Sequence, residues 1–193
     1  GQDGANVRFD PTGNCMNLSA EVAELFFPVV YEAFDIRMDS AGAGTYRGGL
    51  GARLQFRFQG DAELSIETSR TIAGSPGVEG GKTSAVQKLY KLDAEGSSQV
   101  IGGWCEDGSW LNPLLAAHRF QPGEAFRIET SGGGGWGNPM AREVEHVLDD
   151  VLDGYISIPE ARDSYGVVID PEKLEIDGAS TEALRAEEPK AAD

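Results

Sequence analysis

The sequence predicts an α+β protein, with a mainly antiparallel β domain, glycine-rich loops and a short C-terminal helical segment. The β domain is predicted by apolar and polar residues that alternate with a period of two. The 26 glycines also far exceed the usual share of about 7% and indicate many tight turns. Apolar residues at helical spacing follow residue 138. We therefore expect a β-rich domain over 1–137, helices and a strand packed on it over 138–180, and a frayed acidic tail over 181–193.

The first predicted elements are a helix and a strand. Residues 19–27 place their apolar side chains on one helical face, and Pro28 ends the helix. Residues 34–39 then alternate apolar and polar side chains, which is typical of a strand with one solvated face.

A hairpin is predicted over residues 52–67. Two alternating stretches flank a Gln-Gly-Asp turn, and one register pairs apolar residues on one face with opposite charges on the other. In that register Arg57 faces Glu63 and Arg53 faces Glu67. We expect an antiparallel pair with this register.

The rest of the β domain is less regular. Residues 74–81 have the composition of a loop, and 85–92 form a further predicted strand. Pro122 and Gly123 occupy the central positions of a predicted type II turn. This turn introduces a strand over 125–130.

Two helices are predicted near the C-terminus. Apolar residues share one face of a helix over 140–151, and Gly154 ends it. Residues 157–160 read as a capping box for a short helix that ends near Gly166. Beyond Glu182 the composition favours fraying.

Composition restricts the partners and the compartment. With 32 acidic and 16 basic residues the net charge is −16, which disfavours nucleic acid and anionic membranes as partners. No apolar run approaches the ~20 residues that span a bilayer, and no secretory signal is evident. We expect a cytoplasmic protein. Cys15 and Cys105 are then expected to be reduced, and a disulfide between them is the alternative.

Four consecutive glycines, Gly132 to Gly135, join the strand at 125–130 to the helical segment through Trp136. Glycine reaches positive φ without strain and lets another backbone approach closely. The run is either a close approach of this kind or a slack linker. We favour the close approach because Trp136 and the cap at Asn138-Pro139 fix its exit.

A second candidate site is Arg47 with Gly48 and Gly49. An arginine beside two glycines can present its planar guanidinium to a carboxylate or phosphate. The equally weighted alternative is a tight turn in which Arg47 forms a buried salt bridge.

Other candidates are better explained without a catalytic role. Residues 77–83 fail the spacing of a phosphate-binding loop. His118 and His146 lack a second ligand at metal-binding spacing, so no metal site is expected. Acidic neighbours disfavour a thiolate at Cys105.

Three segments resemble the hydantoinase B and oxoprolinase family. Residues 128–139 are similar to its strand of the type IETPGGGGYGDP, residues 37–51 resemble its segment RPDSGGAGRYRGGLG, and residues 153–169 resemble its closing DGYVS and YGVV motifs. The resemblance covers about 21–169 in the family's order. Members are several times longer, and the pattern NDPYHGGTHL that carries their metal ligands is missing here. We therefore expect a split-off subunit or processed fragment rather than a complete enzyme.

The resemblance implies a subunit or C-terminal module of an ATP-dependent complex that opens cyclic amides such as hydantoin, a lactam or 5-oxoproline. It implies a hydantoinase A-like ATP-binding subunit and an N-terminal hydantoinase B-like subunit as partners in a hetero-oligomer. ATP with magnesium and the catalytic metal would lie on those partners, with no cofactor on this chain, and the isolated chain would be inactive. Arg47, Gly48, Gly49, Gly132 to Gly135 and Trp136 are candidates for a substrate wall or an interface, and no catalytic residue is assigned.

Two alternatives remain open at this point. The chain also resembles subunits of ATP-dependent acetone and acetophenone carboxylases, and a non-catalytic scaffold has the same sequence features. The substrate, the stoichiometry of the complex and the choice between hydrolase and carboxylase are left open by the sequence.

Overall fold

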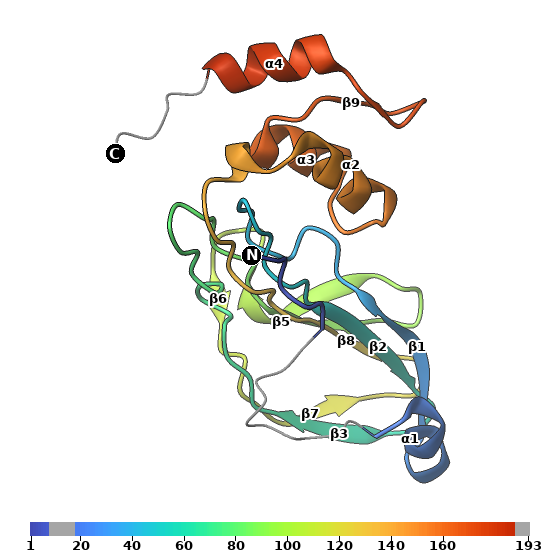
Figure 1. Cartoon of the computed structure of the whole chain (residues 1–193). Coiled ribbons are helices and arrows are strands. Elements are labelled where there is room, and N and C mark those ends of the chain that lie inside the picture. Colours follow the sequence, from blue (N-terminus) through green and yellow to red (C-terminus); the bar gives the residue numbers. More distant parts are fainter. Residues whose placement is uncertain (8–17, 188–193) are drawn as a thin grey trace.

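The computed structural model describes residues 1–7 and 18–187. Strands β1 to β8 gather at one end together with helix α1, helices α2 to α4 lie at the other end, and irregular loops rich in glycine lie between them (Figure 1). The predicted α+β class with a mainly antiparallel sheet is confirmed. None of the helices in the described ranges is long and apolar enough to cross a membrane.

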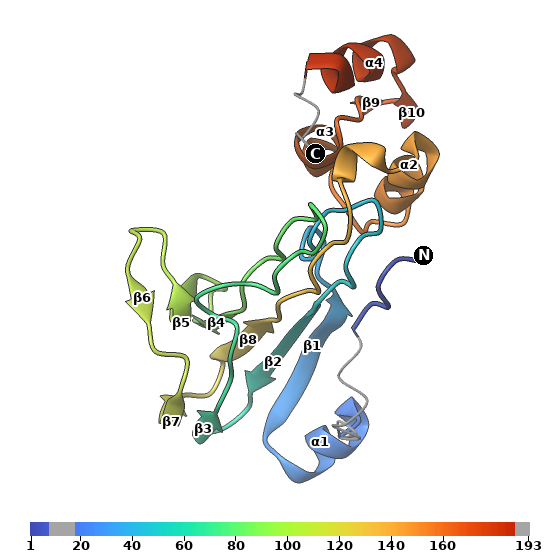
Figure 2. The same cartoon turned by 60° about the vertical axis from the view of Figure 1, so that its left-hand side comes forward.

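The main sheet has six strands and a second, smaller sheet packs on its inner face. The strand order is β1 (Val29–Ile36), β2 (Ala52–Phe58), β8 (Ala125–Glu129), β4 (Lys88–Leu92), β5 (Ser98–Trp104) and β6 (Trp110–Leu111). The smaller sheet pairs β3 (Ala62–Ile66) with β7 (Leu115–Phe120). Apolar residues from both sheets form one core, which includes Phe58, Leu89, Leu115, Phe120 and Phe126. In Figure 2 the sheet is seen to spread from β1 to β6.

The predicted hairpin over 52–67 is wrong. Strand β2 pairs with β1 and β8, whereas β3 pairs with β7 in the other sheet. Arg57 consequently binds Glu32, and Glu63 binds Arg119 at 3.2 Å. Arg53 is likewise paired with Asp35 rather than with Glu67. Alternation correctly predicts which side chains share a face, but it does not specify which strand lies alongside.

The other elements of the β domain follow the sequence with shifted ends. Helix α1 (Ala20–Phe26) begins after Ser19, whose hydroxyl accepts a hydrogen bond from the Val22 N–H. The strand expected over 34–39 is β1, which begins earlier. The turn before β8 is confirmed, with Gly123 at φ 88°.

The helical end contains three short helices, a 3-10 turn and a small ribbon. These are η1 (Pro139–Ala141), α2 (Val144–Leu152), α3 (Ile158–Tyr165), β9 (Ile169–Asp170), β10 (Glu175–Ile176) and α4 (Gly178–Glu187). A second core holds them together, including Val147, Ile156, Ala161, Tyr165 and Val167. Ser157 caps α3 and Gly166 ends it at φ 64°, as predicted. The predicted capping box is incomplete, because the Ser157 N–H donates to Asp39 Oδ1 at 2.7 Å and not to Glu160.

Two expectations for this end need correction. The single helix over 140–151 is interrupted, because Arg142 and Glu143 adopt extended backbone angles between η1 and α2. Residues 181–187 are not frayed, because they belong to α4, and the rest of the predicted tail lies outside the described residues. Thr181 is buried and accepts a hydrogen bond from the Val168 N–H at 3.0 Å, while Arg185 binds the Tyr165 carbonyl. These contacts hold a segment whose composition alone predicts fraying.

Candidate functional site: the glycine layer

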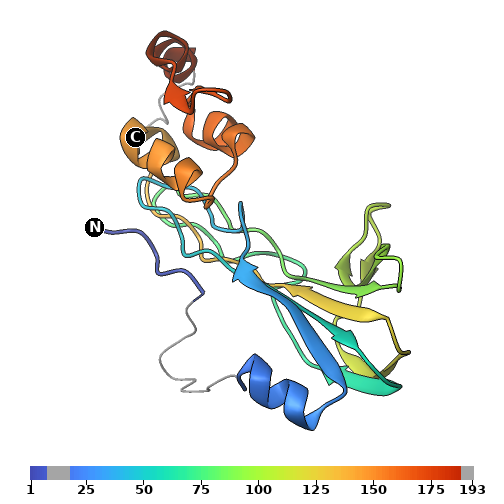
Figure 3. The same cartoon turned by 90° about the vertical axis from the view of Figure 1, so that its right-hand side faces the viewer.

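Between the sheet and the helices, three loops and the N-terminal residues lie side by side as extended backbone (Figures 2 and 3). We call this region the glycine layer and define it as residues 1–7, 40–51, 74–82 and 130–138. Gly133 donates a hydrogen bond to the Gly49 carbonyl and accepts one from the Gly42 N–H, both at 2.8 Å. Gly135 donates to the Lys82 carbonyl at 3.0 Å and accepts from the Val78 N–H at 2.9 Å. The tetraglycine is thus hydrogen-bonded to both of the other loops of the layer, 40–51 and 74–82.

The close approach predicted for Gly132 to Gly135 is confirmed. A Cβ on Gly134 would overlap the Pro76 carbonyl oxygen, and one on Gly135 would overlap the Ala43 carbonyl oxygen. Gly133 has more room, since its Cβ would lie 3.2 Å from the Gly49 nitrogen. Positive φ and close approach are the two reasons expected for glycine from the sequence, and only the second applies here. None of these four glycines has positive φ. Glycine is required here by the neighbouring backbones rather than by a left-handed conformation.

Trp136 closes the layer at its surface. Its backbone forms an antiparallel bridge with Tyr46 and a parallel bridge with Val78. The Trp136 ring lies 5.6 Å from the Tyr46 ring, measured between centroids, and the Trp136 residue is 49% exposed. Of the candidate residues, Trp136 is therefore the one whose side chain is presented outward.

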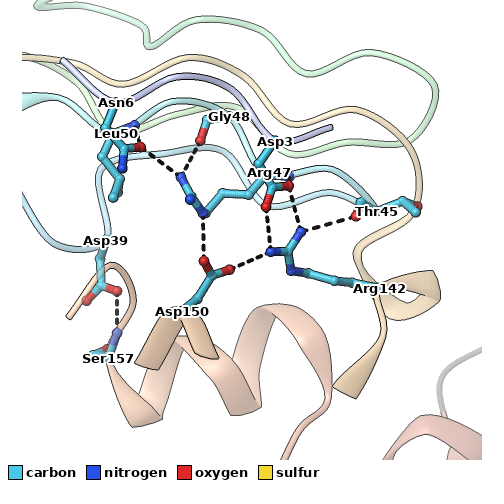
Figure 4. A network of polar contacts seen from close by, with 10 residues as sticks. All are labelled: Asp3, Asn6, Asp39, Thr45, Arg47, Gly48, Leu50, Arg142, Asp150 and Ser157. Atoms are coloured by element: carbon cyan, nitrogen blue, oxygen red, sulfur yellow. Dashed lines mark hydrogen bonds and ion pairs between the residues drawn. The ribbon is translucent and has the colours of Figure 1, made fainter. Parts of the chain in front are cut away.

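Arg47 lies inside the protein, in a polar network between the glycine layer and α2 (Figure 4). Its Nε is 3.2 Å from Asp150 Oδ1, and both side chains are almost fully buried. Its Nη1 donates to Asn6 Oδ1 and to the Gly48 carbonyl. The guanidinium also lies 5.0 Å from the centre of the Tyr155 ring. The geometry matches the buried salt bridge and directs Arg47 inward rather than toward a ligand in solvent.

A second arginine completes this network. Arg142 donates to Asp150 Oδ2 at 2.7 Å and to both carboxylate oxygens of Asp3, at 2.7 and 2.8 Å. Burial raises the pKa of Asp150, and the charges of Arg47 and Arg142 only partly oppose this. At Asp3 burial acts in the same direction, but the hydrogen bond and charge of Arg142 outweigh it and lower the pKa. Two arginines and two aspartates thus join the N-terminal segment, the glycine layer and α2.

The structure brings most of the sequence candidates together. Gly48 and Gly49 lie against the tetraglycine, and a Cβ on Gly48 would overlap the Gly133 carbonyl. Asp3, Arg142 and Asp150 are not among the candidates taken from the sequence, although they are the partners of Arg47 and of each other. The sequence carries no clear signal for Asp150, because this residue lies beside, and not within, the apolar face of the predicted helix.

His118, His146 and Cys105, for which the sequence predicts no catalytic role, lie outside this region. His118 lies on β7 beside Phe120, and burial together with the charge of Lys91 lowers its pKa. His146 is an exposed residue of α2. Within residues 1–7 and 18–187, no group of three or more His, Cys, Asp and Glu side chains is arranged to hold a metal ion. Cys15 lies outside the described residues, and with it the question of a disulfide to Cys105.

Comparison with known proteins decides the family. The model of the hydantoinase B/oxoprolinase family matches residues 1–139. The chain belongs to this family. It is 35% identical over 183 residues to the beta subunit of the caprolactamase of Pseudomonas jessenii, covering 90% of this chain and 29% of that protein. It is 30% identical over 217 residues to the acetone carboxylase alpha subunit of Xanthobacter autotrophicus, covering 96% of this chain and 28% of that protein.

A solved structure agrees with this assignment. This member of the hydantoinase B/oxoprolinase family superposes on the crystal structure of the ATP-dependent caprolactamase from Pseudomonas jessenii with a TM-score of 0.73 and 30% identity. The similarity covers 89% of this chain and 28% of that chain. The chain spans less than a third of the length of three curated relatives that it matches.

Proposed function

We propose that this chain is a module of the B-type component of an ATP-dependent complex that opens cyclic amides. The similarity to the beta subunit of caprolactamase over 90% of the chain carries this proposal. A relative from a Pseudomonas strain, named as the B component of a D-/L-hydantoinase, supports the same reaction class. We assign ring opening of a lactam, hydantoin or 5-oxoproline to the assembled complex rather than to this chain.

Within such a complex the chain acts as a rigid support. The glycine layer is a set of backbones locked by hydrogen bonds, and Arg47 and Arg142 are bound by Asp3 and Asp150. Its described residues offer no cluster suited to a catalytic metal. From the similarity to the B-type relatives, we assign ATP and magnesium to an A-type partner and the catalytic metal to a B-type region outside this sequence. Trp136 is the residue of the layer that we place at an interface or substrate wall.

The composition of the native complex tests this assignment. The chain is tagged in its source organism at the C-terminus, and the purified complex is measured by native mass spectrometry. We expect an A-type ATP-binding chain and a B-type region, in a cytoplasmic hetero-oligomer. Recovery of the chain alone, as a monodisperse and stable monomer, would contradict the proposal.

A carboxylase of the acetone carboxylase type is the second candidate. The 30% identity to the acetone carboxylase alpha subunit over 96% of the chain favours it. Radiolabelled bicarbonate distinguishes the two reactions. A carboxylase incorporates the label into acid-stable product in the presence of acetone and ATP, whereas a cyclic amidohydrolase incorporates none.

A further inference from the structure

Helix α1 carries an apolar face that the described residues of this chain leave exposed. The helix has seven residues and buries only Ala23. Helices this short are marginal in water unless an apolar face packs against something. Two contacts hold α1 in place: the Ser19 cap and a 2.7 Å hydrogen bond from the Tyr31 N–H to Glu24 Oε1. Neither contact covers its apolar side chains.

We define the α1 face by six apolar residues between positions 18 and 30: Leu18, Val22, Leu25, Phe26, Phe27 and Val30. Leu25 is 78% exposed, Phe26 is 72% exposed and Phe27 is 57% exposed. Helix α1 lies at the far end of the sheet from the helical end, beside the edge strand β1 (Figure 3). Large apolar side chains that are this exposed and this close together in the sequence are typical of a binding surface.

We infer that the α1 face packs against the part of the B-type fold that lies outside this sequence. This inference rests on the proposed function. The superposable caprolactamase chain is more than three times as long as the region that matches, so this fold occurs there within one larger polypeptide. We take this occupant to be a separate polypeptide, the N-terminal B-type subunit that the proposed complex includes.

The composition of the face favours this occupant over an A-type partner. Interfaces between parts that never separate resemble a protein core and are strongly apolar. Interfaces between separable subunits are on the whole about as apolar as the rest of the surface. Three consecutive exposed residues, Leu25, Phe26 and Phe27, fit the first class. The outer face of the neighbouring sheet is of the opposite kind, with exposed ion pairs such as Arg53 with Asp35.

Site-directed photo-cross-linking in the native complex tests the inference. Phe26 is replaced by p-benzoylphenylalanine, and cross-linked peptides are identified by mass spectrometry. We expect cross-links to a B-type sequence outside residues 1–193. Cross-links to an A-type chain or to a second copy of this chain would overturn the inference. So would a complex in which position 26 forms no cross-link at all.

A substitution provides an independent measurement. Phe26→Glu should reduce recovery of the B-type region with the tagged chain at least tenfold, because the charge would be buried in an apolar interface. Leu152→Glu is the matched control, since Leu152 is 56% exposed on α2 at the other end of the protein. It should leave recovery unchanged. Circular dichroism of both purified variants checks that they are folded, and equal recovery of the two would contradict the inference.

The outcomes separate this inference from the proposed function. Cross-links to a B-type region in a complex that opens no cyclic amide would uphold the surface and reject the function. A complex that opens cyclic amides, but in which position 26 cross-links to the A-type chain, would uphold the function and reject the surface.

Discussion

Asp150 on α2 accepts a hydrogen bond from Arg47 of the glycine layer at 3.2 Å, and both side chains are almost fully buried. This pair connects the helical end to the loops that hold the tetraglycine. Buried charges of this kind are costly to separate, because removing one partner leaves the other unpaired in a medium of low polarity. The orientation of α2 on the layer therefore depends on Asp150.

Asp150→Asn should destabilise the protein strongly. The substitution keeps the shape but removes the carboxylate that binds the Arg47 guanidinium and leaves Arg142 paired with Asp3 alone. Breaking a buried pair costs about 3 to 5 kcal/mol. Urea unfolding measures the loss. Asp149→Asn is the control, because Asp149 is the exposed neighbour on the same helix. Equal unfolding midpoints for the two variants would show that the network does not stabilise the fold.

Substitutions in the tetraglycine should follow the space around each Cα. Gly134→Ala places a methyl group against the Pro76 carbonyl, and overpacking of this kind costs about 1 to 3 kcal/mol. Gly133→Ala should cost less, because its nearest neighbour is 3.2 Å away. Gly178→Ala is the control, with nothing within 4 Å. Thermal unfolding of the three variants ranks their stabilities. A Gly134→Ala protein as stable as the control would mean that the neighbouring backbone moves away at no cost in stability.

The sequence predicts these features unequally. The cap at Ser157 and the end at Gly166 depend on local backbone chemistry, and both are found where predicted. The close approach of the tetraglycine is also found, although the backbones that require glycine there lie far away in the sequence. The hairpin over 52–67 fails because the partner of β2 is chosen by contacts distant in sequence. For the same reason Arg47 has two equal interpretations from the sequence, since its carboxylate partner Asp150 lies 103 positions away.

The attachment of the N-terminal segment should depend on pH through Asp3. Its pKa in the folded protein lies below the ordinary 3.8, so the unfolded state binds more protons in that range. The stabilisation is therefore present above about pH 4 and is lost as the pH falls through the folded pKa. Asp3→Asn should lose roughly 1 kcal/mol at pH 6, a modest value because the side chain is about a third exposed.

The test compares urea midpoints of the parent protein and Asp3→Asn from about pH 6 down to about pH 2.5, a range that spans the ordinary aspartate pKa. Their difference should shrink toward the acid end. Asp163→Asn, at an exposed position on α3, corrects for the general effect of removing a negative charge. A difference between parent and Asp3→Asn that stays constant across this range would show that the Asp3 carboxylate is not linked to folding.

The central claim, membership of an ATP-dependent complex that opens cyclic amides, is tested most directly by turnover of the native complex. The complex purified through this chain is supplied with caprolactam, hydantoin or 5-oxoproline, with and without ATP and magnesium, and the ring-opened product and ADP are quantified together. We predict ring opening of one of these cyclic amides that requires ATP and releases ADP in proportion to product. ADP release that depends instead on acetone and bicarbonate, with no ring-opened product from any cyclic amide, would contradict the account.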